Sequence, residues 1–255
     1  MTAVEDIGYG AQFDGWYDRI FPKDAHAEAT ARALAALHPD PGAGTLEFGV
    51  GTGRIAVPLS RETGPVTGVD SSAPMLAGLA AEAAAQGAQV TAVHADVRTY
   101  AEERTYGLVY CVCSVLGLIT DPDDQRATIR RAAALLAPGG RLVVETHNRP
   151  AIHALHEGRA HATFFTPYPD PGTGLQTHAV LLDPDLWQCH QIWFEADGTT
   201  RVGSEAVRLL TPDDVDAYAG DAGLTPTARW SGWDATPYDA RSPLFVAVYE
   251  RGAGT

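Results

Sequence analysis

The chain has 255 residues, of which 45% are hydrophobic and 20% charged, and its formal net charge at pH 7 is −14. This composition is typical of a folded globular protein and excludes a disordered or fibrous one; the length suits one α/β core with an insert better than two independent domains. An acidic surface repels phosphate backbones and anionic lipid, so we expect a small-molecule partner and neither nucleic acid nor a membrane.

We expect no export signal in this sequence. No apolar run approaches 18 residues, and the acidic pair Glu5 and Asp6 stands where a secretory signal has basic residues. Cys111, Cys113 and Cys189 lack the spacing of a disulfide framework, which indicates reduced thiols. We therefore expect a cytoplasmic protein.

Helical and extended patterns alternate through the first 149 residues. A helix over residues 24–37 is followed by strands over 45–48, 66–70, 90–94, 108–115 and 141–146, with helices over 53–61, 74–85 and 124–136 between them. A Pro138-Gly139-Gly140 turn is expected before the last of these strands. Such alternation predicts a parallel sheet covered on both faces.

The pattern changes after Arg149, because no helix-length periodic segment follows until Thr211. Strands are predicted over residues 175–182, 186–195 and 199–210, and Asp197-Gly198 between the last two is a hairpin signal. We expect residues 150–210 to form an antiparallel β insert that roofs the substrate site or contacts a second copy of a homodimer, if the chain is not a monomer. Residues 1–149 and 211–255 would form the main domain.

The last segment begins with a strong helix start. Thr211 supplies an N-cap hydroxyl, Pro212 occupies the first helical position, acidic residues follow, and Gly223 ends the helix. Residues 225–230 and 244–250 then supply two closing strands.

A glycine-rich loop, Glu47-Phe48-Gly49-Val50-Gly51-Thr52-Gly53, joins the first strand to its helix and lets backbone amides approach a ligand. The dinucleotide fingerprint G-x-G-x-x-G needs its third glycine at Arg54, whereas this chain has Gly53. The acid at Glu47 would repel a pyrophosphate and suits a ligand with an amino group and a sulfonium. The loop resembles the first motif of class I S-adenosylmethionine-dependent methyltransferases.

Asp70 closes the second strand, 19 residues after Gly51. A carboxylate at this place can accept hydrogen bonds from both ribose hydroxyls of a nucleoside. It also suits an N-cap for the helix that follows. Together with the loop, the spacing favours the nucleoside.

The resemblance to these small-molecule methyltransferases implies an α/β, Rossmann-like sheet of seven strands in the order 3-2-1-4-5-7-6, with strand 7 antiparallel. It implies S-adenosylmethionine as the cofactor and no metal. By position, the family's cofactor contacts fall on Tyr17, Glu47, Gly49, Gly51, Gly53, Asp70, Ser71, Met75, Asp96, Val97 and the carbonyl of Cys111. Simpler alternatives remain for three of them, because Tyr17 also suits a core aromatic, Asp96 a loop cap, and Cys111 inert packing.

The sequence gives fewer signals for the residues that bind the methyl acceptor. His147 follows the fifth strand and titrates near neutral pH, so it is the candidate general base. Candidate substrate-pocket residues are Ser114, Tyr168, His178, Trp187 and His190. Three further histidines lie within nine residues, but no constellation with ligand spacing joins them, so no metal is expected.

We therefore expect methyl transfer from S-adenosylmethionine to a small molecule. Amino-sugar N-methyltransferases of this layout carry a histidine where this chain has Gly117-Leu118, which favours O-methylation over N- or C-methylation. The alternatives are a cofactor-binding protein that catalyses a non-methylating reaction such as cyclisation, and a nicotinamide-dependent oxidoreductase.

Overall fold

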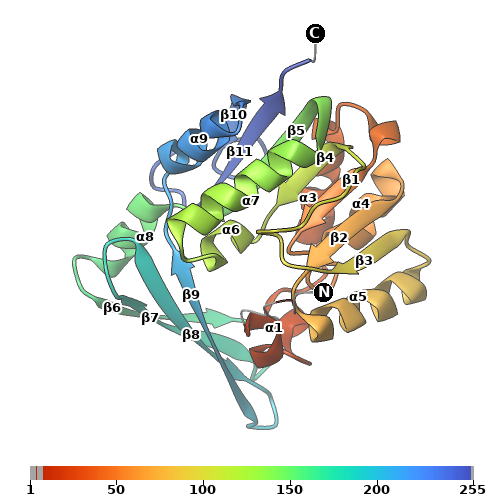
Figure 1. Cartoon of the computed structure of the whole chain (residues 1–255). Helices are drawn as coiled ribbons and strands as arrows, with labels where there is room; N and C mark the ends of the chain where they lie inside the picture. The colour runs from red at the N-terminus through yellow and green to blue at the C-terminus, as the bar shows by residue number, and fades with distance from the viewer. Residues whose placement is uncertain (1–3, 5–7, 254–255) are drawn as a thin grey trace.

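The structure is a computed structural model, and it describes residue 4 and residues 8–253. Glu5 and Asp6, the acidic pair near the N-terminus, lie outside the described residues. Two sheets make up the molecule, a large one flanked by helices and a smaller antiparallel one beside it (Figure 1).

The large sheet has seven strands in the order β10-β11-β5-β4-β1-β2-β3. Its strands are β1 (Thr45–Phe48), β2 (Val66–Asp70), β3 (Val90–His94), β4 (Tyr106–Cys111), β5 (Leu136–His147), β10 (Leu224–Trp230) and β11 (Leu244–Arg251). The pairs among β1 to β5 are parallel, while β11 runs antiparallel to both β5 and β10. In the order of its strands this is the 3-2-1-4-5-7-6 sheet with strand 7 antiparallel, so the predicted fold class is confirmed.

Helices cover both faces of this sheet. The helices α3 (Ala25–Leu37), α4 (Ala56–Thr63) and α5 (Ala73–Gln86) pack in one buried cluster with side chains such as Leu108 and Val143. The helices α7 (Pro122–Leu135) and α9 (Pro212–Asp221) pack in another with Leu46 and Phe245. The two clusters show why the central strands read as nearly continuous apolar runs, because each strand is buried on both sides.

The predicted start of α9 is confirmed in detail. The Thr211 hydroxyl accepts the Asp214 N–H, and the Asp214 carboxylate accepts the Thr211 N–H, which is a capping box. Such a cap satisfies amides that the first helical turn leaves without partners.

The small sheet has the order β6-β7-β8-β9, with strands β6 (His161–Pro167), β7 (Gly174–Leu181), β8 (Leu186–Phe194) and β9 (Thr200–Arg208). All of its pairs are antiparallel, and β8 and β9 are joined at the predicted Asp197-Gly198 turn, where φ of Gly198 is 87°. Along β8, Trp187, Cys189, Gln191 and Trp193 are buried and the residues between them are half-buried. The sheet therefore has one buried face and one exposed face.

Three sequence expectations were wrong in this region. Residues 149–156 form a helix, α8 (Arg149–His156), which is too short to show a helical period. A fourth insert strand, β6, was missed because its exposed and half-buried residues lack a clear alternation of polarity. The segment Pro138-Gly139-Gly140 lies inside β5 and not before it, but the pairing with β4 is irregular there, because the register shifts between the pairs Tyr106–Leu136 and Leu108–Arg141.

The N-terminal segment connects the two sheets. Around the short helices α1 (Tyr9–Gln12) and α2 (Tyr17–Ile20), the side chains of Phe13 and Trp16 pack with Met75 of α5 and with Trp193 of β8. A further one-turn helix, α6 (Val115–Leu118), follows β4, and a 3-10 turn, η1 (Pro41–Ala43), precedes β1. The gap between the sheets is thus closed on one side by aromatic packing.

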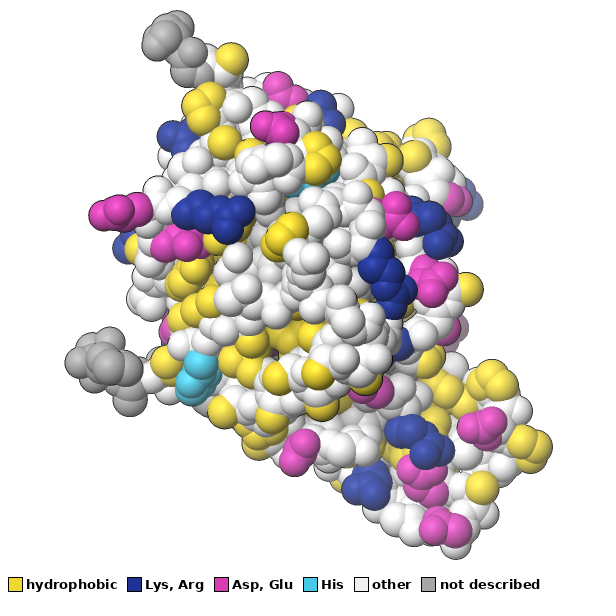
Figure 2. All heavy atoms as spheres, turned by 90° about the vertical axis from the view of Figure 1, so that its right-hand side faces the viewer, with side chains coloured by type: hydrophobic (Ala, Val, Ile, Leu, Met, Phe, Trp, Pro, Cys, Tyr) yellow, Lys and Arg dark blue, Asp and Glu magenta, His cyan; other side chains and the backbone are white. Residues whose placement is uncertain are grey.

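The described residues include no helix that is both long and apolar enough to cross a membrane. The three cysteines are all free thiols, as expected. Acidic and basic side chains are dispersed over the face shown in Figure 2, without a continuous basic patch on that face.

Candidate functional site

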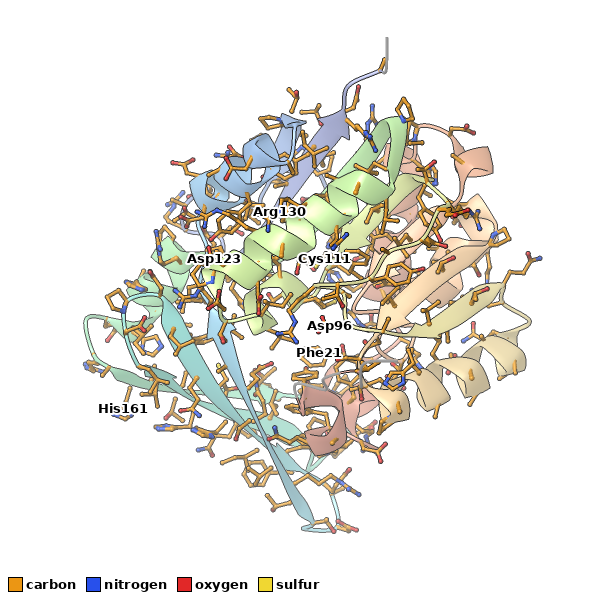
Figure 3. All side chains as sticks on the ribbon, viewed as in Figure 1. Phe21, Asp96, Cys111, Asp123, Arg130 and His161 are labelled. Atoms are coloured by element: carbon orange, nitrogen blue, oxygen red, sulfur yellow. The ribbon has the colours of Figure 1, made fainter. Side chains whose placement is uncertain are left out.

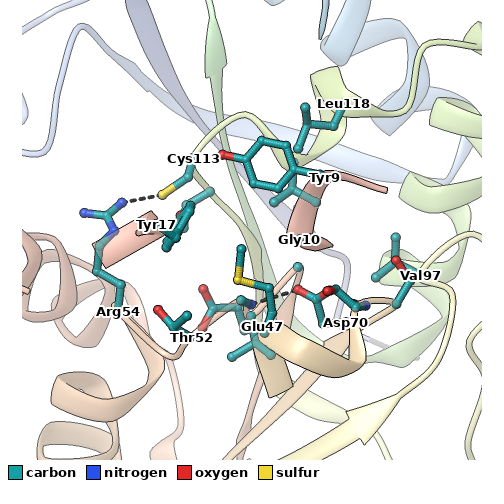
Figure 4. A pocket seen from close by; sticks show the side chains of 18 of the residues that line it. Tyr9, Gly10, Tyr17, Glu47, Thr52, Arg54, Asp70, Val97, Cys113 and Leu118 are labelled. Carbon is teal, nitrogen blue, oxygen red and sulfur yellow. Dashed lines mark hydrogen bonds between the residues drawn. The ribbon is translucent and has the colours of Figure 1, made fainter. Parts of the chain in front are cut away.

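A pocket lies at the carboxyl ends of β1, β2 and β4, below α1, and holds about 980 Å³ of empty space open to solvent. Of the predicted cofactor residues, it is lined by Tyr17, Glu47, Gly49, Gly51, Asp70, Ser71, Met75, Asp96 and Val97. In Figure 4 the rings of Tyr9 and Tyr17 lie on one side of the pocket, and Glu47 and Asp70 lie on the other. The carboxyl ends of parallel strands are where open α/β sheets bind ligands.

The glycines of the loop serve different purposes. Gly49, Gly51 and Gly53 have φ angles of 73°, 54° and 80°, which disfavour any side chain. A Cβ on Gly49 would collide with Val115, and one on Gly53 would collide with Leu79. A Cβ on Gly51 would meet nothing within 4 Å, so the backbone there borders open space. Gly53 does not line the pocket; its conformation instead lets the loop pack against α5.

We expect Gly49→Ala to lower the free energy of unfolding by more than Gly87→Ala, because Gly87 ends α5 in the left-handed conformation and a Cβ there would meet nothing within 4 Å. Both glycines have positive φ, which costs an alanine about 1–2 kcal/mol. Only at Gly49 does the new methyl group also collide with Val115, which adds roughly 1–3 kcal/mol of overpacking. Urea denaturation of the two variants measures the difference; equal losses would contradict the assigned contact.

Glu47 is a buried acid at the end of β1. Its side chain is 2% exposed, and its Oε2 accepts a hydrogen bond of 2.7 Å from the Tyr110 hydroxyl. Burial raises the pKa of Glu47 to about 8, against the opposing effects of Tyr110 and the Arg54 charge. The carboxyl therefore exchanges its proton near neutral pH in the absence of a cationic partner.

Asp70 holds the loop as well as facing the pocket. Its Oδ2 accepts the Gly51 N–H at 2.8 Å, and its Oδ1 accepts the Ser72 N–H at 2.8 Å. A carboxylate oxygen can accept more than one hydrogen bond. Asp70 can therefore cap the backbone and bind a ligand at the same time.

Asp96 lies at the pocket but is already engaged by a cation. Arg98 donates to both oxygens of Asp96 from its side chain, at distances down to 2.6 Å, and also from its backbone N–H. Burial opposes the ionised form, yet these bonds hold the pKa of Asp96 below its ordinary value. Arg98 lines the pocket too and was not predicted.

The fourth strand ends in a strained segment. Cys113 and Ser114 have φ angles of 56° and 59°, and this backbone conformation is costly for any residue other than glycine. The Cys113 N–H donates to the Glu145 carboxylate at 2.8 Å, and the Cys113 sulfur accepts a bond from Arg54, drawn in Figure 4. Val112 and Cys113 line the pocket, whereas Cys111, whose carbonyl is the expected contact, packs in the core and is not among the lining residues.

Two buried polar atoms at the pocket have no hydrogen-bond partner in the part of the chain that the structure describes. They are the Ser72 hydroxyl oxygen and the Arg54 Nε. Leaving such groups unpaired costs about 1–3 kcal/mol each, more for a charged group. A bound ligand with polar groups at these positions would remove that cost.

His147 does not line the pocket, contrary to its expected role as base. Its Nδ1 shares a hydrogen bond of 2.7 Å with the Ser114 hydroxyl, and its ring lies edge-on to Trp187, with 5.2 Å between the ring centroids. Burial lowers the pKa of His147 to about 4. The imidazole is therefore neutral at pH 7 and is a poor proton acceptor. Ser114 is likewise outside the pocket lining.

The remaining candidates also lie outside the pocket. The Tyr168 hydroxyl donates to the Ile20 carbonyl, and the Trp187 Nε1–H donates to His156. His178 and His190 pair across β7 and β8 on the exposed face of the small sheet, with stacked rings 6.3 Å apart. His161 of the same face lies far from Asp96 in Figure 3. The register of the insert strands, which the sequence does not show, sends these histidines outward.

Within residues 4 and 8–253, no group of three or more His, Cys, Asp or Glu side chains is arranged to hold a metal ion.

Several residues of the pocket wall are not predicted by the sequence. The additional lining residues are Tyr9, Gly10, Val50, Thr52, Arg54, Ile55, Ser72, Arg98, Val112, Cys113, Val115, Leu118 and Ile119. Arg54 was recognised only as a departure from the dinucleotide pattern, although a cation directly after the loop was a usable signal. Nothing local marks Tyr9, which reaches the pocket through the packing of α1 on α5.

Residues 45–140 match the family model described as a methyltransferase domain. The matched segment begins at β1 and ends within β5, so it contains the glycine loop, Asp70, Asp96 and Arg98. Solved structures with this fold include methyltransferases with S-adenosylmethionine bound.

Among curated proteins, the chain is 30% identical over 148 residues to a dTDP-3-amino-3,6-dideoxy-alpha-D-glucopyranose N,N-dimethyltransferase of Streptomyces fradiae, covering 56% of each chain. It is 30% identical over 152 residues to a ubiquinone biosynthesis O-methyltransferase of Xanthomonas axonopodis, covering 58% of this chain and 62% of that one. The matches thus span little more than half the length of these relatives. The structure of the CcbJ methyltransferase from Streptomyces caelestis is similar over 96% of this chain and 98% of that chain, with a TM-score of 0.82 and 29% identity.

Proposed function

We propose that the whole protein transfers a methyl group from S-adenosylmethionine to a small-molecule acceptor, because residues 45–140 match a methyltransferase domain and the chain is similar in structure to a methyltransferase over nearly its full length. The observation that carries the proposal is one pocket where an acid at the end of β1, an open glycine loop and the acid at the end of β2 meet.

The pocket residues suit this cofactor. The cofactor has a zwitterionic amino-acid end and a nucleoside end, and the pocket offers acids for cationic and hydroxyl groups and Arg54 for a carboxylate. The unpaired Arg54 Nε and Ser72 hydroxyl are donors that await acceptors. The bare backbone at Gly51 leaves room for a ligand that a side chain would displace.

In this proposal Glu47 faces the amino group, Arg54 and Tyr17 hold the carboxylate, and Asp70 binds the ribose. Ser71, Met75 and Val97 would border the adenine, with the Arg98–Asp96 pair at its edge. Bound there, S-adenosylmethionine supplies an electrophilic methyl group on a sulfonium sulfur. Val115, Leu118 and Ile119 give this part of the pocket an apolar wall, which keeps water from competing with the acceptor.

The acceptor atom is a finer question. O-methylation, favoured by the sequence, needs a base that removes the hydroxyl proton, whereas a neutral amine needs none. His147, the base expected for this step, lies outside the pocket lining and has a lowered pKa. We also propose that residues 150–210 roof the acceptor side, since α1 packs against both the pocket and β9.

We expect S-adenosylhomocysteine to raise the melting temperature of the protein and NADH to leave it unchanged. At about 100 times its dissociation constant a ligand stabilises the folded state by about 2.7 kcal/mol. For a chain of this size that corresponds to roughly 5–10 °C. Differential scanning fluorimetry measures both; stabilisation by NADH alone would revive the oxidoreductase alternative.

Consumption of S-adenosylmethionine with a panel of amines and alcohols then separates methyl transfer from a reaction without methylation. Formation of S-adenosylhomocysteine together with a methylated product supports the proposal. A converted substrate with the cofactor left intact would support the cyclisation alternative.

A further inference from the structure

A second hollow adjoins the cofactor pocket on the side of the small sheet. Tyr9 and Leu118 line both spaces, so the two meet at these side chains. The far wall of the second hollow comes from β8 and β9, with Gln188, Ser204, Glu205 and Ala206. If the proposed function is right, an acceptor that reaches the cofactor from the insert side occupies this hollow.

Glu205 is the one residue with a carboxyl or cationic side chain among the described residues that line the hollow. Its Oε1 accepts a hydrogen bond of 3.2 Å from the Gln191 Nε2, and the Gln191 Oε1 accepts one of 2.6 Å from the Thr177 hydroxyl. Because Thr177 can donate to the amide oxygen, the chain of bonds turns the amide nitrogen of Gln191 toward Glu205. The carboxyl is thus held in place from two neighbouring strands.

The second oxygen of this carboxyl is not engaged by the part of the protein that the structure describes. No hydrogen bond to Glu205 Oε2 occurs among the described residues, and this oxygen is not among the fully buried polar atoms without partners. Nor does Glu205 form an ion pair with any described arginine, lysine or histidine. Glu195 and Asp185, which flank the two ends of β8, do form ion pairs. Glu205, which lines the hollow, therefore has one acceptor oxygen that the described residues leave unused.

The electrostatic surroundings make this oxygen selective. Burial raises the pKa of Glu205, opposed only by the bond from Gln191. The pKa of Tyr9 is raised by burial and then by the charge of Glu205, which shows that the carboxyl acts on the side chain at the junction of the two spaces. A carboxylate in such a place is costly until a cation or charge-assisted donor reaches it, and a neutral hydroxyl compensates it less well.

We propose that Glu205 selects the methyl acceptor by binding a basic amine, and that the carboxylate takes up the ammonium proton so that the neutral nitrogen can accept the methyl group. This inference rests on the proposed function and narrows it, because it assigns an amine rather than a hydroxyl compound as the substrate class. The Thr177–Gln191 pair positions the carboxylate, and Leu118 with the ring of Tyr9 contacts the apolar part of the acceptor. Glu205 is a specificity residue of the insert, which the sequence alone did not single out.

The test compares matched amines and alcohols, such as cyclohexylamine and cyclohexanol, by saturation-transfer NMR on the full chain, with and without S-adenosylhomocysteine. We expect the wild-type protein to bind the amines more tightly than the alcohols. Glu205→Gln keeps an acceptor for Gln191 but removes the charge, and it should reduce amine affinity by roughly tenfold to a hundredfold while alcohol affinity stays the same.

Glu195→Gln is the matched control, because Glu195 lies at the end of the same hairpin and pairs with Arg19 at 2.7 Å, outside the hollow. It should keep the amine preference. Equal binding of amines and alcohols by the wild-type protein, no amine binding, or an amine preference that survives Glu205→Gln would each overturn the inference. Failure to bind S-adenosylhomocysteine would instead overturn the proposed function, and the titrations without that ligand still test Glu205.

Discussion

Glu47→Gln should weaken the binding of S-adenosylmethionine and at the same time stabilise the cofactor-free protein at alkaline pH. The buried carboxyl has a pKa of about 8 in the folded chain and an ordinary value near 4.5 when exposed. A cationic amino group would compensate its charge, whereas a glutamine offers only a neutral dipole. We expect a loss of about 1.5–3 kcal/mol in cofactor affinity, measured by isothermal titration calorimetry.

The sign of the stability effect follows from the raised pKa. Between about pH 4.5 and pH 8 the folded chain holds a proton on Glu47 that the unfolded chain releases, so the contribution of this residue to the free energy of unfolding falls as pH rises. The full cost is reached above pH 8. Removing the carboxyl abolishes this cost, so the variant should gain about 2–4 kcal/mol at pH 8.5 and nothing below pH 4.5.

Tyr110→Phe provides the control for Glu47. It removes the hydroxyl that donates to the carboxylate at 2.7 Å but leaves the acid in place. The variant should therefore lose stability at pH 8.5, in contrast to Glu47→Gln. Urea denaturation at both pH values tests the pair; a Glu47→Gln protein with unchanged cofactor affinity and an unchanged pH profile would contradict the assignment.

Asp70→Asn should weaken the binding of S-adenosylhomocysteine by about 1–3 kcal/mol, and Asp70→Ala should have at least as large an effect. The carboxylate accepts backbone N–H groups on both oxygens, from Gly51 and Ser72, while facing the pocket. An asparagine presents an NH₂ group to one of these N–H donors, so the loop loses a hydrogen bond as well as a ligand contact.

A matched control separates the two effects. Asp183 also accepts two backbone N–H groups with its carboxylate, from Asp185 at 2.7 Å and Leu186 at 2.8 Å, but lies in the exposed turn before β8. Asp183→Ala should cost stability without changing the affinity for S-adenosylhomocysteine. If Asp70→Ala behaves in the same way, Asp70 is only a backbone cap and its role toward the ribose is wrong.

The sequence by itself determined the fold class and the side of the pocket nearest the glycine loop. Each signal there is local: Glu47, the glycines and Asp70 stand at junctions of strand and helix, where chain order decides which backbone groups face the sheet edge. Parallel strands bring such junctions to one edge whatever the rest of the chain does. The nine predicted cofactor residues that line the pocket are all of this local kind, apart from Tyr17.

Only the tertiary structure determined which residues form the wall of the pocket opposite the glycine loop. Tyr9 and Glu205 lie almost two hundred positions apart, and they meet because α1 packs against both α5 and β9. The register of the insert strands places Glu205 on the same face as Cys189 and Gln191, and it places His178 and His190 on the opposite face, since a shift of one residue reverses every side chain of a strand. Packing against Trp187 likewise removed His147 from the pocket. Pairings between distant segments set these positions, and no local pattern in the sequence records them.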